Sequence, residues 1–129
     1  MESARIAYID DNKLCLEVIK SAFAELNINV DTFDDPILFY QNSKSYMCVI
    51  FDYEMPLLNG HQLVEMAKEK DPLVKTIIYS GYIEHLDQYQ KSVDKYLSKP
   101  CDFDKLVAVV SYLLQNYDRE NRLLTQTQG

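Results

Sequence analysis

Short apolar runs alternate with longer amphipathic segments along the whole 129-residue chain. Five runs have the length and composition of strands: 6–9, 28–33, 47–51, 74–79 and 95–98. Parallel strands need a crossover segment between them, and right-handed crossover helices then cover both faces of the sheet. The alternation therefore predicts an α/β fold, a doubly wound parallel sheet of five strands with five helices.

The intervening segments predict the helices. In the first, apolar residues recur at steps of three and four and are expected to share the buried face: Leu14, Cys15, Val18, Ile19, Ala22, Phe23 and Leu26. Asp35 and Pro36 form a helix start, and a short helix is expected at 61–70. The segment 84–92 is the least apolar and should pack loosely. The last helix carries a strong stripe: Phe103, Leu106, Val107, Val110, Leu113, Leu114 and Tyr117.

Charge and composition exclude several classes of protein. The 20 acidic residues outnumber the 13 basic ones, which gives a net charge of −7 and argues against direct binding of nucleic acid. No apolar stretch reaches the roughly 20 residues of a membrane helix, and no export signal opens the chain, so a cytoplasmic protein is expected. The three cysteines lack C-x-x-C spacing, so we expect neither disulfides nor structural zinc.

Polar residues follow all five strands, but the second strand, which is followed by Asp34 and Asp35, is expected at the outer edge of the sheet, away from the ends of the other four. In a flavodoxin-like sheet of order 2-1-3-4-5 the positions after those four strands are neighbours at one edge. They are Asp10 and Asp11, Asp52, Ser80, and Lys99. Taken singly, the acidic pair is a helix cap, Asp52 a turn residue and Lys99 a solvated strand terminator. Together, the clustered carboxylates call for a divalent cation such as Mg²⁺, and the set predicts a phosphate site built around an aspartate.

At these positions the chain resembles the receiver domains of two-component response regulators. The resemblance covers about residues 4–116 and rests on four pieces: Asp10-Asp11, the run 52–60 (DYEMPLLNG), Ser80-Gly81 and the run 96–100 (YLSKP). It implies that Asp52 is the phosphoacceptor. It also implies that Asp11, Asp52 and the backbone carbonyl of Glu54 bind Mg²⁺ directly, with Mn²⁺ able to substitute, while Asp10 acts mainly through a water molecule.

The resemblance also assigns the switch. Lys99 would contact a phosphoryl oxygen, and Ser80 would move toward the phosphoryl group and let Tyr96 turn inward. That movement would change the surface made by helix four, strand five and helix five. Glu54 and Tyr82 depart from the usual pattern, and we expect them to tune the lifetime of the phosphorylated state. His61 and His85 are expected to be surface residues.

The implied function is regulatory phosphotransfer rather than enzymatic turnover. The phosphoryl donor would be a histidine kinase or a histidine phosphotransfer protein, and the output a domain in cis or a protein partner in trans. A phosphorylation-dependent homodimer stays open. We expect a receiver domain at 1–116 and a helix extension, linker or tail at 117–129.

Three other functions fit these residues less well. A degenerate receiver that binds without phosphorylation is disfavoured because every catalytic position is filled. A phosphohydrolase with an aspartyl-phosphate intermediate commonly has a second Asp where this chain has Glu54. A flavodoxin-like cofactor binder needs a phosphate loop, but only the acidic pair follows the first strand.

Overall fold

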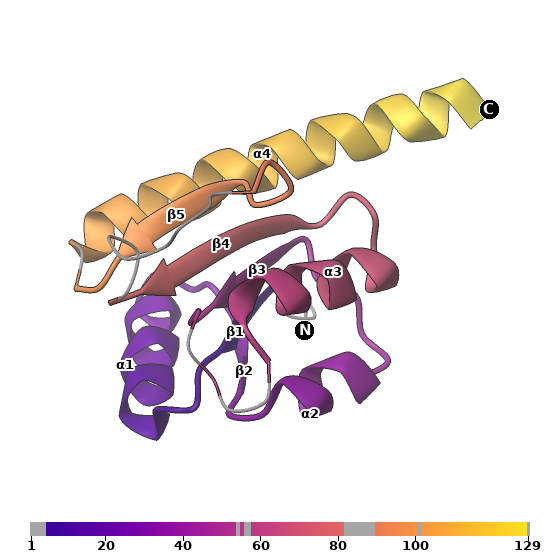
Figure 1. Cartoon of the computed structure of the whole chain (residues 1–129). Helices are drawn as coiled ribbons and strands as arrows, with labels where there is room; N and C mark the ends of the chain where they lie inside the picture. The colour runs from indigo at the N-terminus through magenta and orange to yellow at the C-terminus, as the bar shows by residue number, and fades with distance from the viewer. Residues whose placement is uncertain (1–4, 54, 56–57, 82–89, 101, 129) are drawn as a thin grey trace.

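The computed structural model describes residues 5–53, 55, 58–81, 90–100 and 102–128. The elements of this part of the chain run in the order shown in Figure 1: β1 (Ile6–Ile9), α1 (Lys13–Ala24), β2 (Val30–Phe33), α2 (Pro36–Gln41), β3 (Cys48–Phe51), α3 (Gly60–Lys70), β4 (Lys75–Ser80), β5 (Lys95–Ser98) and α4 (Phe103–Gln128).

The strands form one parallel sheet of order β2-β1-β3-β4-β5, which confirms the predicted fold and strand order. Four of the five predicted helices are among the described elements. The other, predicted at 84–92, falls mostly on residues outside the described part. Its last three positions are described and lie in the turn before β5, where the Val93 amide donates to the Gln90 carbonyl at 3.1 Å.

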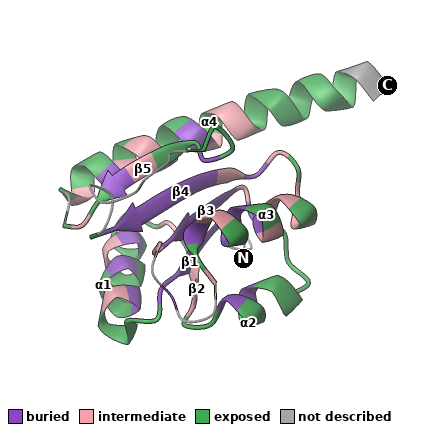
Figure 2. Ribbon diagram, in the orientation of Figure 1, coloured by how far each residue is buried: buried purple, intermediate pink, exposed green. Residues whose placement is uncertain are grey.

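The sheet separates two cores. Helices α1 and α4 cover one face, and α2 and α3 cover the other (Figure 1). Because side chains alternate along a strand, Ile6 and Tyr8 of β1 enter the first core while Ala7 and Ile9 enter the second. The central strands β1, β3 and β4 are almost wholly buried, the edge strands β2 and β5 are partly exposed, and the helices expose their outer sides (Figure 2). Strands β1, β3 and β4 are therefore packed on both faces, and this packing fixes the positions of the residues that follow them.

The buried face of α1 differs from the prediction. Leu16, Ile19 and Phe23 are buried, whereas Leu14 and Val18 are 69% and 57% exposed. At 3.6 residues per turn, Leu14 and Val18 lie about half a turn from Leu16 and point away from the sheet. The apolar residues of this helix fill two faces, and spacing alone did not identify the one that packs.

Asn and Asp side chains begin three of the helices close to the strand ends. Asn12 caps α1 by accepting from the amides of Leu14 and Cys15, and Asp35 caps α2 at the Ile37 amide, as predicted from the Asp-Pro pair. Asn59 and Gln62 form a capping box at the start of α3. Asn12, rather than the acidic pair before it, therefore caps α1.

Helix α4 is one continuous helix that continues past Tyr117, which the sequence left open. Its stripe is buried at Leu106, Val110 and Leu113, whereas Leu123 and Leu124 are 57% and 47% exposed. Between these parts, three contacts attach it to the body. Tyr117 donates to Asp71 at 2.5 Å, Asp118 pairs with Arg5 at 3.0 Å, and Glu120 pairs with Lys75 at 2.6 Å.

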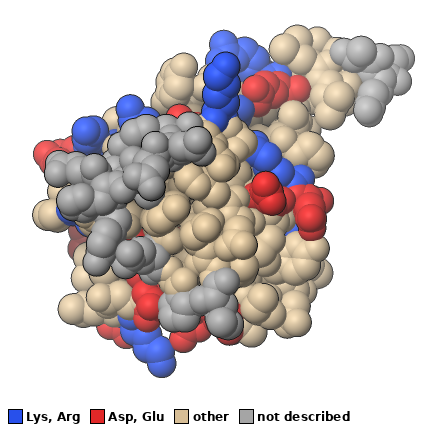
Figure 3. Space-filling view, viewed as in Figure 1, with Lys and Arg blue, Asp and Glu red and all other residues tan. Residues whose placement is uncertain are grey.

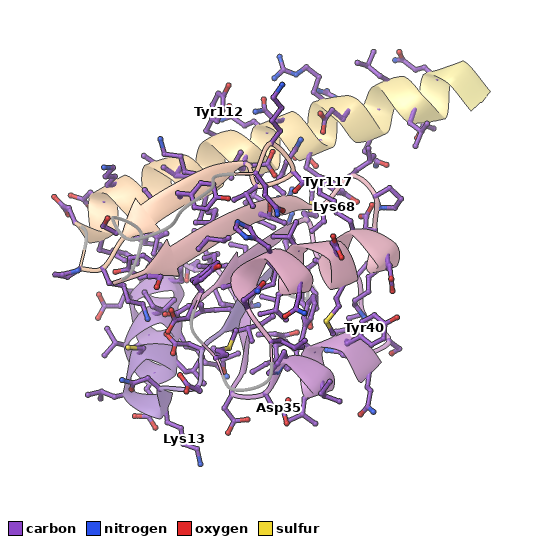
Figure 4. The ribbon with its side chains drawn as sticks, viewed as in Figure 1. Lys13, Asp35, Tyr40, Lys68, Tyr112 and Tyr117 are labelled. Carbon is purple, nitrogen blue, oxygen red and sulfur yellow. The ribbon has the colours of Figure 1, made fainter. Side chains whose placement is uncertain are left out.

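Figure 4 shows how α4 divides its side chains. Tyr117 lies on the side of the helix that faces the body, and Tyr112 lies on the outer side, where it is 62% exposed. On the face shown in Figure 3, acidic and basic side chains of the described residues are interspersed around a largely uncharged centre. None of the described helices is both long enough and apolar enough to cross a membrane.

Candidate functional site

The predicted polar residues converge where the strands end. Asp10 and Asp11 follow β1, and Asp52 follows β3. One carboxylate oxygen from each of these three residues lies within 4.8 Å of the others. Lys99, which follows β5, places its Nζ 2.5 Å from Asp10 Oδ2 and 3.6 Å from Asp52 Oδ2. The parallel sheet thus assembles three carboxylates and one ammonium group from three separate loops.

Asp10 forms the floor of this site. Its side chain has no exposure to solvent, and Oδ1 accepts the Asn12 amide at 2.9 Å. Oδ2 accepts from Lys99 Nζ and from the Tyr8 hydroxyl, which lies 2.8 Å away. The acidic pair therefore does not serve mainly as a cap, because Asp10 faces the interior of the site.

Tyr8 was not among the predicted site residues. It looks like an ordinary residue of a buried strand, but residues two apart on a strand point to the same face, and this spacing pairs it with Asp10. Burial first, and then the charge of Asp10, raise the pKa of the Tyr8 hydroxyl far above its ordinary value. The hydroxyl therefore stays protonated and acts as a donor.

The carboxylates differ in exposure. Asp11 is exposed, while the Asp52 and Lys99 side chains are 16% and 21% exposed. Burial alone would lower the pKa of Lys99, but the hydrogen bond and charge of Asp10, with the charge of Asp52, outweigh it and raise the pKa above its ordinary value. Lys99 thus keeps its positive charge, and three carboxylates against one ammonium leave an excess of negative charge.

This donor set fits a hard divalent cation. Mg²⁺ favours oxygen ligands and typically takes one or two carboxylates together with water and phosphate oxygens. Asp11 and Asp52 offer partly exposed carboxylates beside the buried Asp10, so an ion could approach from solvent. The residues present are therefore those a magnesium site requires.

Ser80 ends β4 and is fully buried, and its carbonyl accepts the Lys99 amide at 3.1 Å. This bond joins the ends of β4 and β5 and places both residues at the sheet edge that carries Asp52. Glu54 and Tyr82, predicted as a carbonyl ligand and as tuning residues, lie outside the described residues, as does Cys101.

Tyr96 of β5 is held by two partners that the sequence did not reveal. Its hydroxyl bonds His61 Nε2 at 2.8 Å and accepts the Gln90 amide at 2.8 Å. The His61 ring also packs edge-on against Tyr53, the neighbour of Asp52, with ring centroids 5.3 Å apart. Burial lowers the pKa of His61. His61 is thus a partly exposed residue with contacts to Tyr53 and Tyr96 that the sequence did not predict, and His85 lies outside the described residues.

Gly60 makes this arrangement possible. A Cβ atom at this position would lie 3.1 Å from the Tyr53 ring and 3.3 Å from the Tyr53 Cα. The absence of a side chain lets the first turn of α3 approach Tyr53 closely, which sets His61 between Tyr53 and Tyr96. Helical periodicity could place His61 at the start of α3, but its contact with β5 depends on tertiary structure.

Comparison with known proteins gives a consistent family. The family model described as the response regulator receiver domain matches residues 6–111. The DNA-binding transcriptional regulator NtrC of Salmonella typhimurium is 25% identical over 127 residues, which cover 95% of this chain and 27% of NtrC. The regulatory protein VanRB of Enterococcus faecalis is 27% identical over 119 residues, which cover 88% of this chain and 53% of VanRB. The chain thus spans about a quarter of the NtrC length.

Solved structures agree with this match. The response regulator TrrA of Thermotoga maritima, in complex with Mg²⁺ and BeF, matches with a TM-score of 0.77 at 27% identity. The match covers 86% of this chain and 99% of the TrrA chain. The receiver domain of Francisella response regulator 1452 has a TM-score of 0.72 at 28% identity, covering 88% and 98%. These likenesses favour a receiver domain over a phosphohydrolase or a flavodoxin-like cofactor binder.

Proposed function

The chain belongs to the family of response regulator receiver domains, and we propose that Asp52 is the residue that accepts the phosphoryl group. Receiver domains act in two-component signal transduction, so the role is regulatory. The observation that carries the assignment is the cluster of Asp10, Asp11 and Asp52, whose oxygens lie within 4.8 Å of one another beside the Lys99 ammonium.

In the proposed reaction an Asp52 carboxylate oxygen attacks the phosphorus of a phosphohistidine. The new O–P bond forms as the P–N bond breaks, and the electron pair of that bond goes to the departing imidazole nitrogen. Lys99, 3.6 Å from Asp52 Oδ2, is placed to bind a phosphoryl oxygen. The donor is a histidine kinase or a histidine phosphotransfer protein.

Receiver domains bind Mg²⁺ at an acidic cluster of this kind. Here Asp11, Asp52 and the Glu54 carbonyl would hold the ion, with Asp10 acting through water and Mn²⁺ as a substitute. A bound divalent ion supplies charge neutralisation for the carboxylates and for the incoming phosphoryl oxygens. The chain's own contribution is to keep Asp10 in a fixed orientation under the site, through Asn12, Tyr8 and Lys99.

The proposed switch connects Ser80 with Tyr96. Ser80 moves toward the phosphoryl group, and the Tyr96 ring changes its position. This alters the surface that includes β5 and α4, the last of the predicted helices. To turn, Tyr96 must give up its bonds to His61 and to the Gln90 amide. Because His61 also contacts Tyr53, the residue beside Asp52, the phosphoacceptor loop and the switch tyrosine share a common neighbour.

We further propose a receiver unit at 1–116 and, at 117–129, an extension that is helical as far as Gln128 and leads to an output domain in cis or acts on a partner in trans. Support comes from the length of the curated relatives, of which this chain covers 27% in NtrC and 53% in VanRB. Phosphorylation-dependent pairing of two copies, and tuning of the phosphorylated state by Glu54 and Tyr82, belong to the same proposal.

Mass spectrometry tests the phosphoacceptor directly. The protein is incubated with Mg²⁺ and a small acyl phosphate, and the intact mass should show one added phosphoryl group that is absent from Asp52→Asn. Asp34→Asn is the matched control, because Asp34 also follows a strand of this sheet and should leave the adduct intact. An unlabelled native protein, or equal labelling of Asp52→Asn, would refute the assignment.

A further inference from the structure

Tyr8 and Lys99 donate hydrogen bonds to the same oxygen atom, Oδ2 of Asp10. The tyrosine is fully buried in β1, and its hydroxyl lies 2.8 Å from Asp10 Oδ2, the atom that Lys99 Nζ approaches to 2.5 Å. A carboxylate oxygen accepts two hydrogen bonds with good geometry, so these two donors saturate Oδ2. The Asn12 amide occupies Oδ1. Asp10 is thus held by a neutral donor and a cationic donor at the same atom.

The two donors differ in their freedom to move. Lys99 is a flexible side chain, 21% exposed, and it also lies within 3.6 Å of Asp52. Tyr8 is fixed among core residues and cannot follow it. If Lys99 turns to a phosphoryl oxygen on Asp52, Asp10 loses its cation while still fully buried. A buried carboxylate oxygen without a donor is costly, so the movement of Lys99 is opposed unless another donor remains.

We propose that Tyr8 is a positioning residue that keeps Asp10 Oδ2 hydrogen-bonded when Lys99 leaves it for the phosphoryl group. This inference rests on the proposed phosphorylation of Asp52 and adds a residue to it. Tyr8 does not touch the reacting atoms. It lowers the cost of releasing Lys99 from Asp10, so it favours the phosphorylated state over the unphosphorylated one.

A purely structural role makes a different prediction. A buried tyrosine needs an acceptor for its hydroxyl, and Tyr46 shows such a case, with its hydroxyl 2.6 Å from Asp31 Oδ2. If Tyr8 only satisfied its own hydroxyl, its loss would destabilise all states of the protein equally. A positioning role instead changes the affinity for a phosphoryl group, because only in that state does Asp10 depend on Tyr8 alone at Oδ2.

The experiment compares Tyr8→Phe, which keeps the ring and removes the hydroxyl, with Tyr46→Phe as the matched control. Magnesium affinity is measured by titration calorimetry, beryllofluoride affinity is measured at saturating Mg²⁺, and urea unfolding checks that each variant folds. Tyr8→Phe should weaken beryllofluoride binding by a factor about ten times larger than any factor by which it weakens magnesium binding, as expected for a missing hydrogen bond to a charged group. In Tyr46→Phe the two affinities should change together.

The same comparison in a Lys99→Met background identifies the partner of Tyr8. There Asp10 has no lysine to lose, so removing the Tyr8 hydroxyl should no longer weaken beryllofluoride selectively. Equal losses of both affinities in Tyr8→Phe, or a selective loss that persists without Lys99, would overturn the inference while native binding of beryllofluoride still supports the proposed function. A native protein that binds no beryllofluoride would overturn both.

Discussion

Replacing Asp52 with Asn should stabilise the metal-free protein, because this residue sits among like charges. Its carboxylate is within 4.8 Å of those of Asp10 and Asp11 and 3.6 Å from Lys99. At an effective dielectric constant of about 20, one charge pair at 4.8 Å amounts to about 3.5 kcal/mol and one at 3.6 Å to about 4.6 kcal/mol. Two repulsions thus exceed one attraction by about 2 kcal/mol.

Solvent reduces this figure. Asp11 is exposed, so its repulsion is weaker than the calculation assumes, and we expect Asp52→Asn to gain about 1 kcal/mol, or about 4 °C in Tm. The assay is urea unfolding in a chelator and again in excess Mg²⁺. The order of stability should reverse with the metal, because the native site gains more from the ion.

A matched control separates local repulsion from total charge. Asp34→Asn removes the same charge outside the cluster and should change the free energy of unfolding by less than about 0.5 kcal/mol. If Asp52→Asn is no more stable than the native protein in chelator, or if Mg²⁺ stabilises both to the same extent, the electrostatic reasoning is wrong.

Two further predictions concern His61 and α4. Burial lowers the pKa of His61 below 6.5 in the folded protein, so the free energy of unfolding is unaffected by this group above that pH and decreases as the pH falls toward the folded-state pKa. In urea unfolding, His61→Gln should lose less free energy of unfolding than the native protein between about pH 7 and 5.5, and an equal loss in both would contradict this. Glu120→Gln should lower the free energy of unfolding by about 1 kcal/mol, because its partner Lys75 is only 12% exposed. Asp118→Asn should lower it by less than about 0.5 kcal/mol, because both members of that pair are exposed, and equal losses in urea unfolding would count against the distinction.

The sequence was most informative where backbone topology alone decides position. Parallel strands in the order 2-1-3-4-5 must bring their ends together, so the convergence of Asp10, Asp52 and Lys99 could be predicted without knowing any side-chain conformation.

The sequence was less informative where the outcome depends on which way a side chain packs. Helix α1 has apolar residues on two faces, and only the contacts with the sheet decide that Leu16 is buried and Leu14 exposed. The contacts of His61 could not be predicted for a related reason. A single histidine near a helix start has no pattern around it, and its bond to Tyr96 joins residues 35 positions apart.

Helix α4 is attached to the body in two regions and extends beyond both. It is held along Leu106 to Leu113 by the core and again at Tyr117, Asp118 and Glu120 by polar contacts near the opposite end of the strands from Asp52. The residues beyond Glu120 extend the helix by about 12 Å, at about 1.5 Å per residue. A tilt of about 10° around the polar contacts would therefore move the end of the helix by about 2 Å. If the helix tilted in this way, the contacts at residues 117–120 would be the pivot, and their strength would set how far the end of the helix moves.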